Sequence, residues 1–382
     1  MFGVLRRCEK DILRYTSSVR RVFLNGLLFL AVLLLMLLLA EGAWRLLFSR
    51  GDVHRVYDPE LGRVNPPHAE WVMRTPEYVT HIRTNSRGFR GPEFPEERTE
   101  DEVRILFIGD SFVEAKQVEE EDRFVEQVGN ALADRWHRPV VTRALGVGGA
   151  DPAKELLFYR NLGREFDPDI VVQVLFPEND LPLRHGHYTV SHREGVLTLE
   201  SIWPEVAPSC DWKCRFLQKS ELVRRMYLLM RHVQRESKDT ALPTLLGDFF
   251  WYTTEGQQVM QEERLPLLSL FTGTLQQEVE ADGAEFFAVL IPGAFEMYET
   301  WRDEAIEQYG SVPQDIWNPS GVLDLVGEEF TEKKIPFVDL RSAFHAQVRE
   351  GEFLHYKLDS HLHERGHGTV TDVLVEELTK IL

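Results

Sequence analysis

The fold is decided by residues 103–111, which read VRILFIGDS. Apart from Arg104, residues 103–108 are all apolar, and the run ends in a glycine followed by two residues that favour turns. A short, nearly continuous apolar run that ends in turn residues predicts a strand buried on both faces. Such strands are typical of parallel sheets that carry helices on both sides.

The segments that follow alternate between helical and strand patterns. Helices are predicted at 124–136, 155–166, 267–281 and 364–381, and further strands at 140–145, 169–176, 286–291 and 335–339. Strands that alternate with helices imply right-handed crossover connections. The sequence therefore predicts an α/β fold of three layers, with a doubly wound and mostly parallel sheet.

Two segments depart from this alternation. Residues 41–100 are rich in proline, glycine and charge, and their short alternating runs predict strands. We call this segment the collar, because it is expected to lie between a membrane helix and the main domain at 101–382. Residues from about 183 to 262 are too many for a simple connection and predict an insertion. An apolar stripe at helical spacing in 222–233 predicts that the insertion is partly helical.

The N-terminal residues predict a membrane anchor. Residues 22–40 are apolar except for Asn25 and Gly26, and about 20 such residues span a bilayer as a helix. Six basic and two acidic residues in 1–21 place that segment in the cytoplasm. The remainder is expected outside the inner (cytoplasmic) membrane, in the periplasm or its equivalent. The alternative is a cleaved signal peptide, although 39–43 make a poor cleavage site.

Charge and cysteine content restrict the partners. The chain of 382 residues has a formal net charge of −19, which argues against nucleic acid as a partner. Cys8 is expected in a reducing compartment, whereas Cys210 and Cys214 would face an oxidising one. The spacing of the last two permits a local disulfide, with free thiols as the alternative. No neighbouring Cys or His pair completes a metal site.

Three short motifs contain the groups that acyl transfer requires. They are Gly-Asp-Ser at 109–111, Glu-Asn-Asp at 178–180 and Asp-Ser-His at 359–361. The first two follow predicted strands and the third lies in a late loop, so all three are expected at the carboxyl edge of the sheet, where ligands bind. In this hypothesis Ser111 is the nucleophile, His361 the general base and Asp359 the carboxylate that orients the imidazole.

The oxyanion of such a reaction needs hydrogen-bond donors that already point at it. The backbone N–H of Ser111 opens a predicted helix, the N–H of Gly149 has no Cβ to obstruct it, and Asn179 carries a side-chain amide. Each motif alone is also an ordinary turn, polar loop or helix cap. Their occurrence together, in this order, favours an active site.

At these motifs the chain resembles the SGNH (GDSL-type) hydrolases. Residues 104–112, 145–149, 177–180 and 359–367 resemble the four blocks of that family, and 84–91 resemble its membrane-anchored members. The resemblance implies a flavodoxin-like fold, a serine nucleophile at Ser111, oxyanion donors at Gly149 and Asn179, and no metal or other cofactor.

The chain departs from the usual blocks at two places. Pro177 stands where the third block usually has glycine. The last block has Asp-x-His in place of the common Asp-x-x-His, and in this it resembles alginate O-acetyltransferase-like proteins. His363 is a second candidate base beside His361, although its spacing to Gly366 does not fit the block.

Three other groups of residues are not expected to belong to the active site. The histidines at 185, 187 and 192 predict a solvated loop rather than a metal site, and the acidic residues 119–122 predict negative charge at a helix N-terminus. The tryptophans at 203, 212, 251 and 301 are interpreted mainly as core residues.

The expected function is that of a membrane-anchored, extracytoplasmic serine esterase or acylhydrolase that acts on O-acyl esters, including O-acetylated glycans. One alternative is an O-acetyltransferase that acts on envelope or secreted polysaccharide. Another, from a different class, is a catalytically inactive scaffold that binds glycans.

Overall fold

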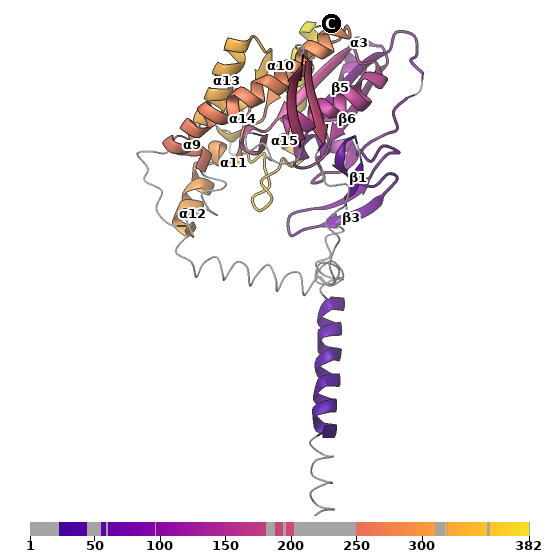
Figure 1. Cartoon of the computed structure of the whole chain (residues 1–382), viewed down its shortest axis with the longest axis vertical. Helices are drawn as coiled ribbons and strands as arrows, with labels where there is room; N and C mark the ends of the chain where they lie inside the picture. The colour runs from indigo at the N-terminus through magenta and orange to yellow at the C-terminus, as the bar shows by residue number, and fades with distance from the viewer. Residues whose placement is uncertain are drawn as a thin grey trace, which may run out of the picture. The chain divides into compact units, whose positions relative to one another are not determined.

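The structure is a computed structural model that describes residues 23–43, 55–58, 60–95, 97–180, 188–193, 196–201, 250–309, 318, 320–349 and 352–381. The chain divides into two compact units. The described part of the first unit is the N-terminal helix Phe23–Ala43 (Figure 1). Its 21 residues have a mean hydropathy of 2.7, so it is long and apolar enough to cross a membrane.

Five parallel strands form the central sheet of the second unit. Their order is β11-β10-β7-β5-β6. The strands are β5 (Val103–Gly109), β6 (Val140–Gly146), β7 (Ile170–Leu175), β10 (Glu285–Leu290) and β11 (Phe337–Asp339). The winding direction changes between β5 and β7, which creates the crevice where open α/β sheets bind their ligands.

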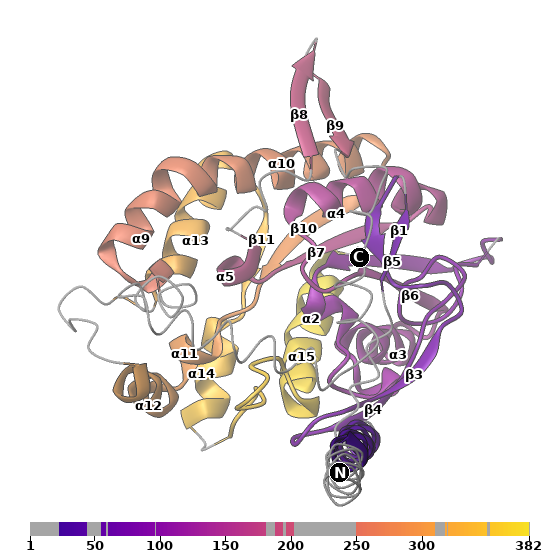
Figure 2. The same cartoon turned by 60° about the horizontal axis from the view of Figure 1, so that its bottom comes forward.

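Helices cover both faces of this sheet, which confirms the three-layer prediction (Figure 2). One face carries α4 (Pro152–Phe158), α10 (Leu265–Ala281) and α13 (Gly321–Lys333), and the other carries α3 (Phe124–Trp136), α14 (Arg341–Arg349) and α15 (Glu364–Ile381). Side chains of β5 alternate between the two layers. Leu106 and Ile108 pack under α4 and α10, whereas Ile105 and Phe107 pack under α3 and α15.

The helical layer on the α10 side begins earlier than the sequence predicts. Helix α9 (Thr254–Val259) continues through a π-helical turn at Met260–Arg264 into α10, and both Tyr252 and Met260 are fully buried in the core. The insertion therefore ends before residue 250. Its described part is an antiparallel hairpin of β8 (Tyr188–Arg193) and β9 (Val196–Ser201). The predicted stripe at 222–233 and the two cysteines of the insertion lie outside the described residues.

Short elements complete the second unit. They are α2 (Ser111–Glu114), a 3₁₀ turn at Glu120–Asp122, a π-helical turn at Tyr159–Gly163, a 3₁₀ turn at Arg164–Phe166, α5 (Pro177–Asp180), a 3₁₀ turn at Phe250–Tyr252, α11 (Ala294–Met297) and α12 (Glu299–Tyr309).

The collar is made of two hairpins that pack on the α/β core. Strand β1 (Val56–Asp58) pairs with β2 (Gly62–Val64), and β3 (Glu70–Arg74) pairs with β4 (Val79–Arg83). Leu61, Val64 and Phe89 are buried in the same apolar cluster as α4 and α10. The described part of the collar and the sheet therefore share one core.

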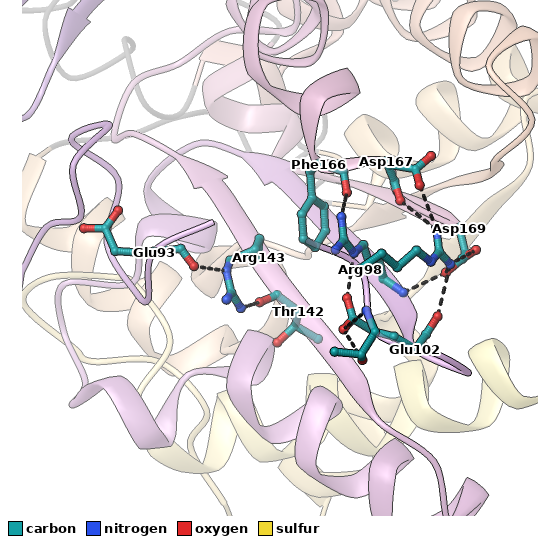
Figure 3. A network of polar contacts seen from close by, with 10 residues as sticks. Glu93, Arg98, Glu102, Thr142, Arg143, Phe166, Asp167 and Asp169 are labelled. Carbon is teal, nitrogen blue, oxygen red and sulfur yellow. Dashed lines mark hydrogen bonds and ion pairs between the residues drawn. The ribbon is translucent and has the colours of Figure 1, made fainter. Parts of the chain in front are cut away.

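Ion pairs tie together the amino-terminal edge of the sheet, opposite the predicted site (Figure 3). Arg98 pairs with Asp167, at 3.0 Å, and with Asp169, both just before β7. Arg104 of β5 donates to Glu102 at 2.6 Å, and both side chains are 4% exposed. This network fixes the starts of β5 and β7 relative to one another.

Candidate active site

The turn after β5 presents Ser111 at the carboxyl edge of the sheet. The strand ends at Gly109, and α2 begins at Ser111. The carboxylate of Asp110 caps α2 by accepting the N–H of Phe112 at 2.9 Å. A Cβ on Gly109 would lie 2.7 Å from the carbonyl oxygen of Val174, so this close approach of the chains requires glycine.

Ser111, His361 and Asp359 form one chain of hydrogen bonds. Nε2 of His361 lies 2.8 Å from Oγ of Ser111, and Nδ1 lies 2.6 Å from Oδ1 of Asp359. A proton on Nδ1 leaves Nε2 free to accept the serine hydroxyl hydrogen bond. Oγ also lies 3.2 Å from Oδ2 of Asp110, the longer of its two contacts. The structure thus brings together three predicted residues, of which Ser111 and His361 are 250 positions apart in the sequence.

The loop that carries His361 is tightly turned. The N–H of Ser360 donates to the carbonyl of Tyr356 at 2.9 Å, and the N–H of Tyr356 donates to the carbonyl of His361 at 2.8 Å. Ser360 has a φ of 60°, in the left-handed region. This turn aims both Asp359 and His361 inward, and the ring of Phe112 packs 4.9 Å from the imidazole.

The charges of the pair shift both pKa values. Burial alone would lower the pKa of His361, but the hydrogen bond and the charge of Asp359 outweigh it, so that pKa rises above its usual 6.5. Burial would raise the pKa of Asp359, but hydrogen bonds from His361, Tyr78 and Gln117 lower it below its usual value. The geometry therefore favours a carboxylate beside an imidazole of increased basicity.

One predicted backbone donor belongs to Ser111 itself, and the other belongs to Gly149, next to Gly148, whose position borders the side chain of Ser111. The N–H of Ser111 is at the N-terminus of α2. Gly149 lies in the turn after β6, closed by a hydrogen bond from Ala150 N–H to the carbonyl of Val147 at 2.8 Å, and its φ of 71° favours glycine. The backbone of Asn179 is in α5, directly after β7, but its side chain lies outside the described atoms.

A buried carboxylate that the sequence did not reveal holds the Gly149 turn in place. Oε2 of Glu114 accepts the N–H of Gly148 at 2.7 Å. Oε1 accepts the amide of Asn65, from the collar, at 2.7 Å and lies 2.9 Å from Nζ of Lys116. Glu114 therefore links α2, the turn after β6 and the collar.

Three further residues contact the Asp359 loop and were also missed. Oδ2 of Asp359 accepts the hydroxyl of Tyr78 at 2.5 Å, and Oδ1 accepts the amide of Gln117 at 3.0 Å. The carboxylate of Glu77 accepts the N–H groups of Leu358 and Asp359, each at 3.0 Å. Since 281 residues separate Tyr78 from Asp359, no local pattern in the sequence predicts this contact.

Two carboxyl groups lie fully buried beneath the site. Burial and the neighbouring charge of Asp110 raise the pKa values of Glu155 and Asp180 well above their usual range. Glu155 accepts the amide of Gln173 at 2.7 Å, and Asp180 accepts the N–H of Phe176 at 2.6 Å. Burial at the strand ends therefore disfavours the charged form of both groups.

The structure also places several of the other residues that the sequence analysis considered. Nδ1 of His363 accepts the N–H of Arg365 at 3.1 Å, whereas His361 contacts Ser111. Within the described ranges, no group of three or more His, Cys, Asp and Glu residues forms a metal site. Glu120–Asp122 form a 3₁₀ turn just before α3. Trp251 and Trp301 are buried. His192 was predicted to lie in a loop, but its backbone belongs to strand β8. The histidines at 185 and 187 and the tryptophans at 203 and 212 lie outside the described residues.

Comparisons with known proteins rest on structure, since no family model and no curated protein sequence matches the chain. Similar solved structures include an acetyl xylan esterase, AlAXEase (13% identity, 72% of this chain and 99% of that chain, TM-score 0.38). A lipase/acylhydrolase from Enterococcus faecalis has 13% identity over 73% of this chain and 97% of that chain, with a TM-score of 0.38. A GDSL-like lipase from Bacteroides thetaiotaomicron has 11% identity over 75% and 93%, with a TM-score of 0.36.

Proposed function

We propose that this chain is a serine esterase or acylhydrolase that acts through an acyl-enzyme on O-acyl esters. The observation that carries the proposal is the chain of hydrogen bonds from Ser111 through His361 to Asp359, at 2.8 and 2.6 Å. Both distances are within the range for catalytic proton transfer. An inactive scaffold would have no need for this alignment.

In the proposed reaction Oγ of Ser111 attacks the ester carbonyl while Nε2 of His361 takes the serine proton. The negative charge of Asp359 stabilises the imidazolium that results. The tetrahedral intermediate then collapses, the C–O bond to the leaving alcohol breaks, and His361 returns the proton to that oxygen. The acyl group remains on Ser111.

Water completes the reaction by the same route. His361 takes a proton from water, the hydroxide attacks the acyl-enzyme, and Ser111 leaves with the proton. The oxyanion of each intermediate would accept the N–H groups of Ser111 and Gly149, with the amide of Asn179 as a third donor. Removal of one such donor typically costs about 3 kcal/mol of barrier stabilisation.

The test of this proposal is covalent labelling of the folded protein with a fluorophosphonate, which reacts with activated serines. We expect the natural chain to be labelled and Ser111→Ala to remain unlabelled, because Ser111 is the hydroxyl that an imidazole activates. Ser86→Ala is the matched control, since Ser86 lies in an exposed collar turn and bonds only to Glu93 among described groups. Equal labelling of Ser111→Ala would contradict the proposal.

The same acyl-enzyme serves a transferase if a sugar hydroxyl replaces water as the acceptor. Release of acetate from an acetyl ester should therefore be compared with and without an oligosaccharide acceptor. Release that does not depend on the acceptor supports the esterase, and an acetylated oligosaccharide product supports the O-acetyltransferase.

We further propose that the helix Phe23–Ala43 anchors the chain in the inner membrane, with residues 1–21 in the cytoplasm and the collar and the main domain at 101–382 in the periplasm. The support is the length and apolarity of the helix together with the basic residues that precede it. External protease that fails to digest the domain in spheroplasts would contradict this topology.

A further inference from the structure

The carboxylate of Asp359 is held from three sides. Its Oδ1 contacts His361 and Gln117, and its Oδ2 accepts the hydroxyl of Tyr78 at 2.5 Å. The side chain of Asp359 is 21% exposed, whereas Tyr78 as a residue is 7% exposed. Oδ1 therefore faces the imidazole of His361, while the hydroxyl of Tyr78, from a remote part of the chain, holds Oδ2 in place.

Tyr78 is itself held rigidly. It ends the connection between β3 and β4, where its N–H donates to Oγ1 of Thr75 at 3.1 Å and its carbonyl accepts the N–H of Thr75 at 2.9 Å. Its ring packs 4.9 Å from that of Tyr356. The neighbouring Glu77 accepts two backbone N–H groups of the Asp359 loop. This collar hairpin therefore contacts both the backbone and the carboxylate of the loop.

We propose that Tyr78 is a positioning residue for Asp359, so that the collar hairpin is part of the catalytic apparatus. This inference rests on the proposed esterase function. Without the tyrosine hydroxyl, Asp359 can rotate away from the imidazole. The loss of its hydrogen bond leaves His361 poorly oriented, which slows catalysis, and it removes an interaction that raises the pKa of His361.

The test is Tyr78→Phe, which removes one hydroxyl and keeps the ring. We expect kcat for an acetyl ester to fall about 10-fold, as for loss of a hydrogen bond to a charged group, with KM within about twofold. The kinetic pKa of the acid limb should fall below that of the natural enzyme, because His361 loses part of its interaction with Asp359. Tyr159→Phe is the matched control, because Tyr159 also donates to a carboxylate, Asp282, at 2.8 Å but far from the site.

A kcat within about twofold of the natural value overturns the inference, since the hydroxyl would then not position the carboxylate. A kinetic pKa that rises also overturns it, because Asp359 would then still face the imidazole with its full charge. Natural enzyme that hydrolyses no ester and takes no fluorophosphonate label contradicts the proposed function itself, which separates the two failures.

A second observation, independent of the first, concerns positive charge beside Ser111. A Cβ on Gly148 would lie 2.9 Å from Nη2 of Arg55 and 3.4 Å from Cβ of Ser111, so both groups border the same point. The side chain of Arg55 is 29% exposed, and its ion pair with Glu114 is long, at 3.9 Å. Arg55 is therefore a partly exposed cation close to Ser111.

Glu114 neutralises Arg55 incompletely because its oxygens serve other groups. They accept hydrogen bonds from Asn65 and Gly148 and pair with Lys116. Burial, and then the charge of Arg55, lower the pKa of the nearby Lys154 to about 7.

We infer that Arg55 binds an anionic group, a carboxylate or a phosphate, on the substrate beside the ester that Ser111 attacks. This also rests on the proposed function and names the class of substrate. A guanidinium suits both groups, because its planar donors bind two oxygens of either anion.

The test compares phenyl acetate with its 4-carboxylate and 4-phosphate derivatives, in the natural enzyme and in Arg55→Gln. We expect kcat/KM for at least one anionic ester to fall about 10-fold, mainly through KM, and that for phenyl acetate to stay within about twofold. The two anionic arms distinguish carboxylate from phosphate. Arg87→Gln is the matched control, since Arg87 pairs with Glu165 on an exposed surface.

An equal loss for the neutral and the anionic esters overturns this inference, because Arg55 would then act on the reacting atoms or on the fold. No loss for any ester also overturns it. In both cases the activity of the natural enzyme toward phenyl acetate still supports the proposed function.

Discussion

Replacement of His361 by alanine is expected to lower kcat/KM for an acetyl ester by roughly 10⁴-fold, because the serine hydroxyl loses the imidazole that takes its proton. Ser111 then attacks without transferring its proton to an imidazole. The residual rate enhancement comes from the oxyanion donors and from substrate binding. The measurement is steady-state hydrolysis of an activated ester, with rates corrected for spontaneous hydrolysis and unfolding temperatures compared by calorimetry.

His363→Ala is the matched control for that experiment. The two histidines lie two residues apart in one loop, but only His361 contacts Oγ of Ser111, whereas His363 accepts the N–H of Arg365. We expect His363→Ala to retain activity within about threefold. The reverse order of effects would assign the base to His363 and defeat the mechanism.

Asp359→Asn is expected to lower kcat/KM by roughly 10³- to 10⁴-fold, although its shape is almost unchanged. Three donors point at this side chain, from His361, Gln117 and Tyr78. An amide offers one acceptor oxygen where the carboxylate offers two. If its NH₂ faces the imidazole, Nδ1 must accept, and the proton moves to Nε2, where it blocks acceptance from Ser111.

The same variant should change the pH profile. In the natural enzyme Asp359 raises the pKa of His361 above 6.5, and the active form is the neutral imidazole, so activity falls as pH drops through that raised value. Asparagine removes the charge and leaves burial, which lowers the pKa. The acid limb of kcat/KM against pH should therefore move to lower pH. An unchanged limb would mean that Asp359 does not interact with the ionising base.

Most of the sheet could be predicted from local patterns. Residues 103–109 and 170–175 are buried along their whole length, so continuous apolar runs reveal them. The final helix begins at Glu364 and ends at Ile381, as its apolar spacing predicts. Because of Pro266, the sequence predicts a helix that begins at residue 267, whereas the helical layer begins at Thr254. A proline normally marks a helix start, but here the preceding π-helical turn admits its ring.

Some residues of the candidate site could be predicted from local sequence, and others could not. Ser111, Gly149 and the 359–361 motif follow from turn chemistry and position along the chain, since the carboxyl ends of parallel strands meet at one edge. Tyr78, Gln117 and Glu114 could not be predicted, because each acts through a contact with a residue distant in sequence. Nothing in the residues around Tyr78 distinguishes it from an ordinary tyrosine at the end of a hairpin.

The distance of 250 residues between Ser111 and His361 has a consequence for how activity returns after denaturation. The turn at Ser111 forms together with β5 and its neighbouring strands. The imidazole of His361 belongs to the segment before α15, and it is placed only when α15 packs against α3. Contacts so remote in sequence close late, because long loops are slow to form. Ester hydrolysis should therefore recover after the circular dichroism signal, and its rate reports the final docking of the C-terminal helix.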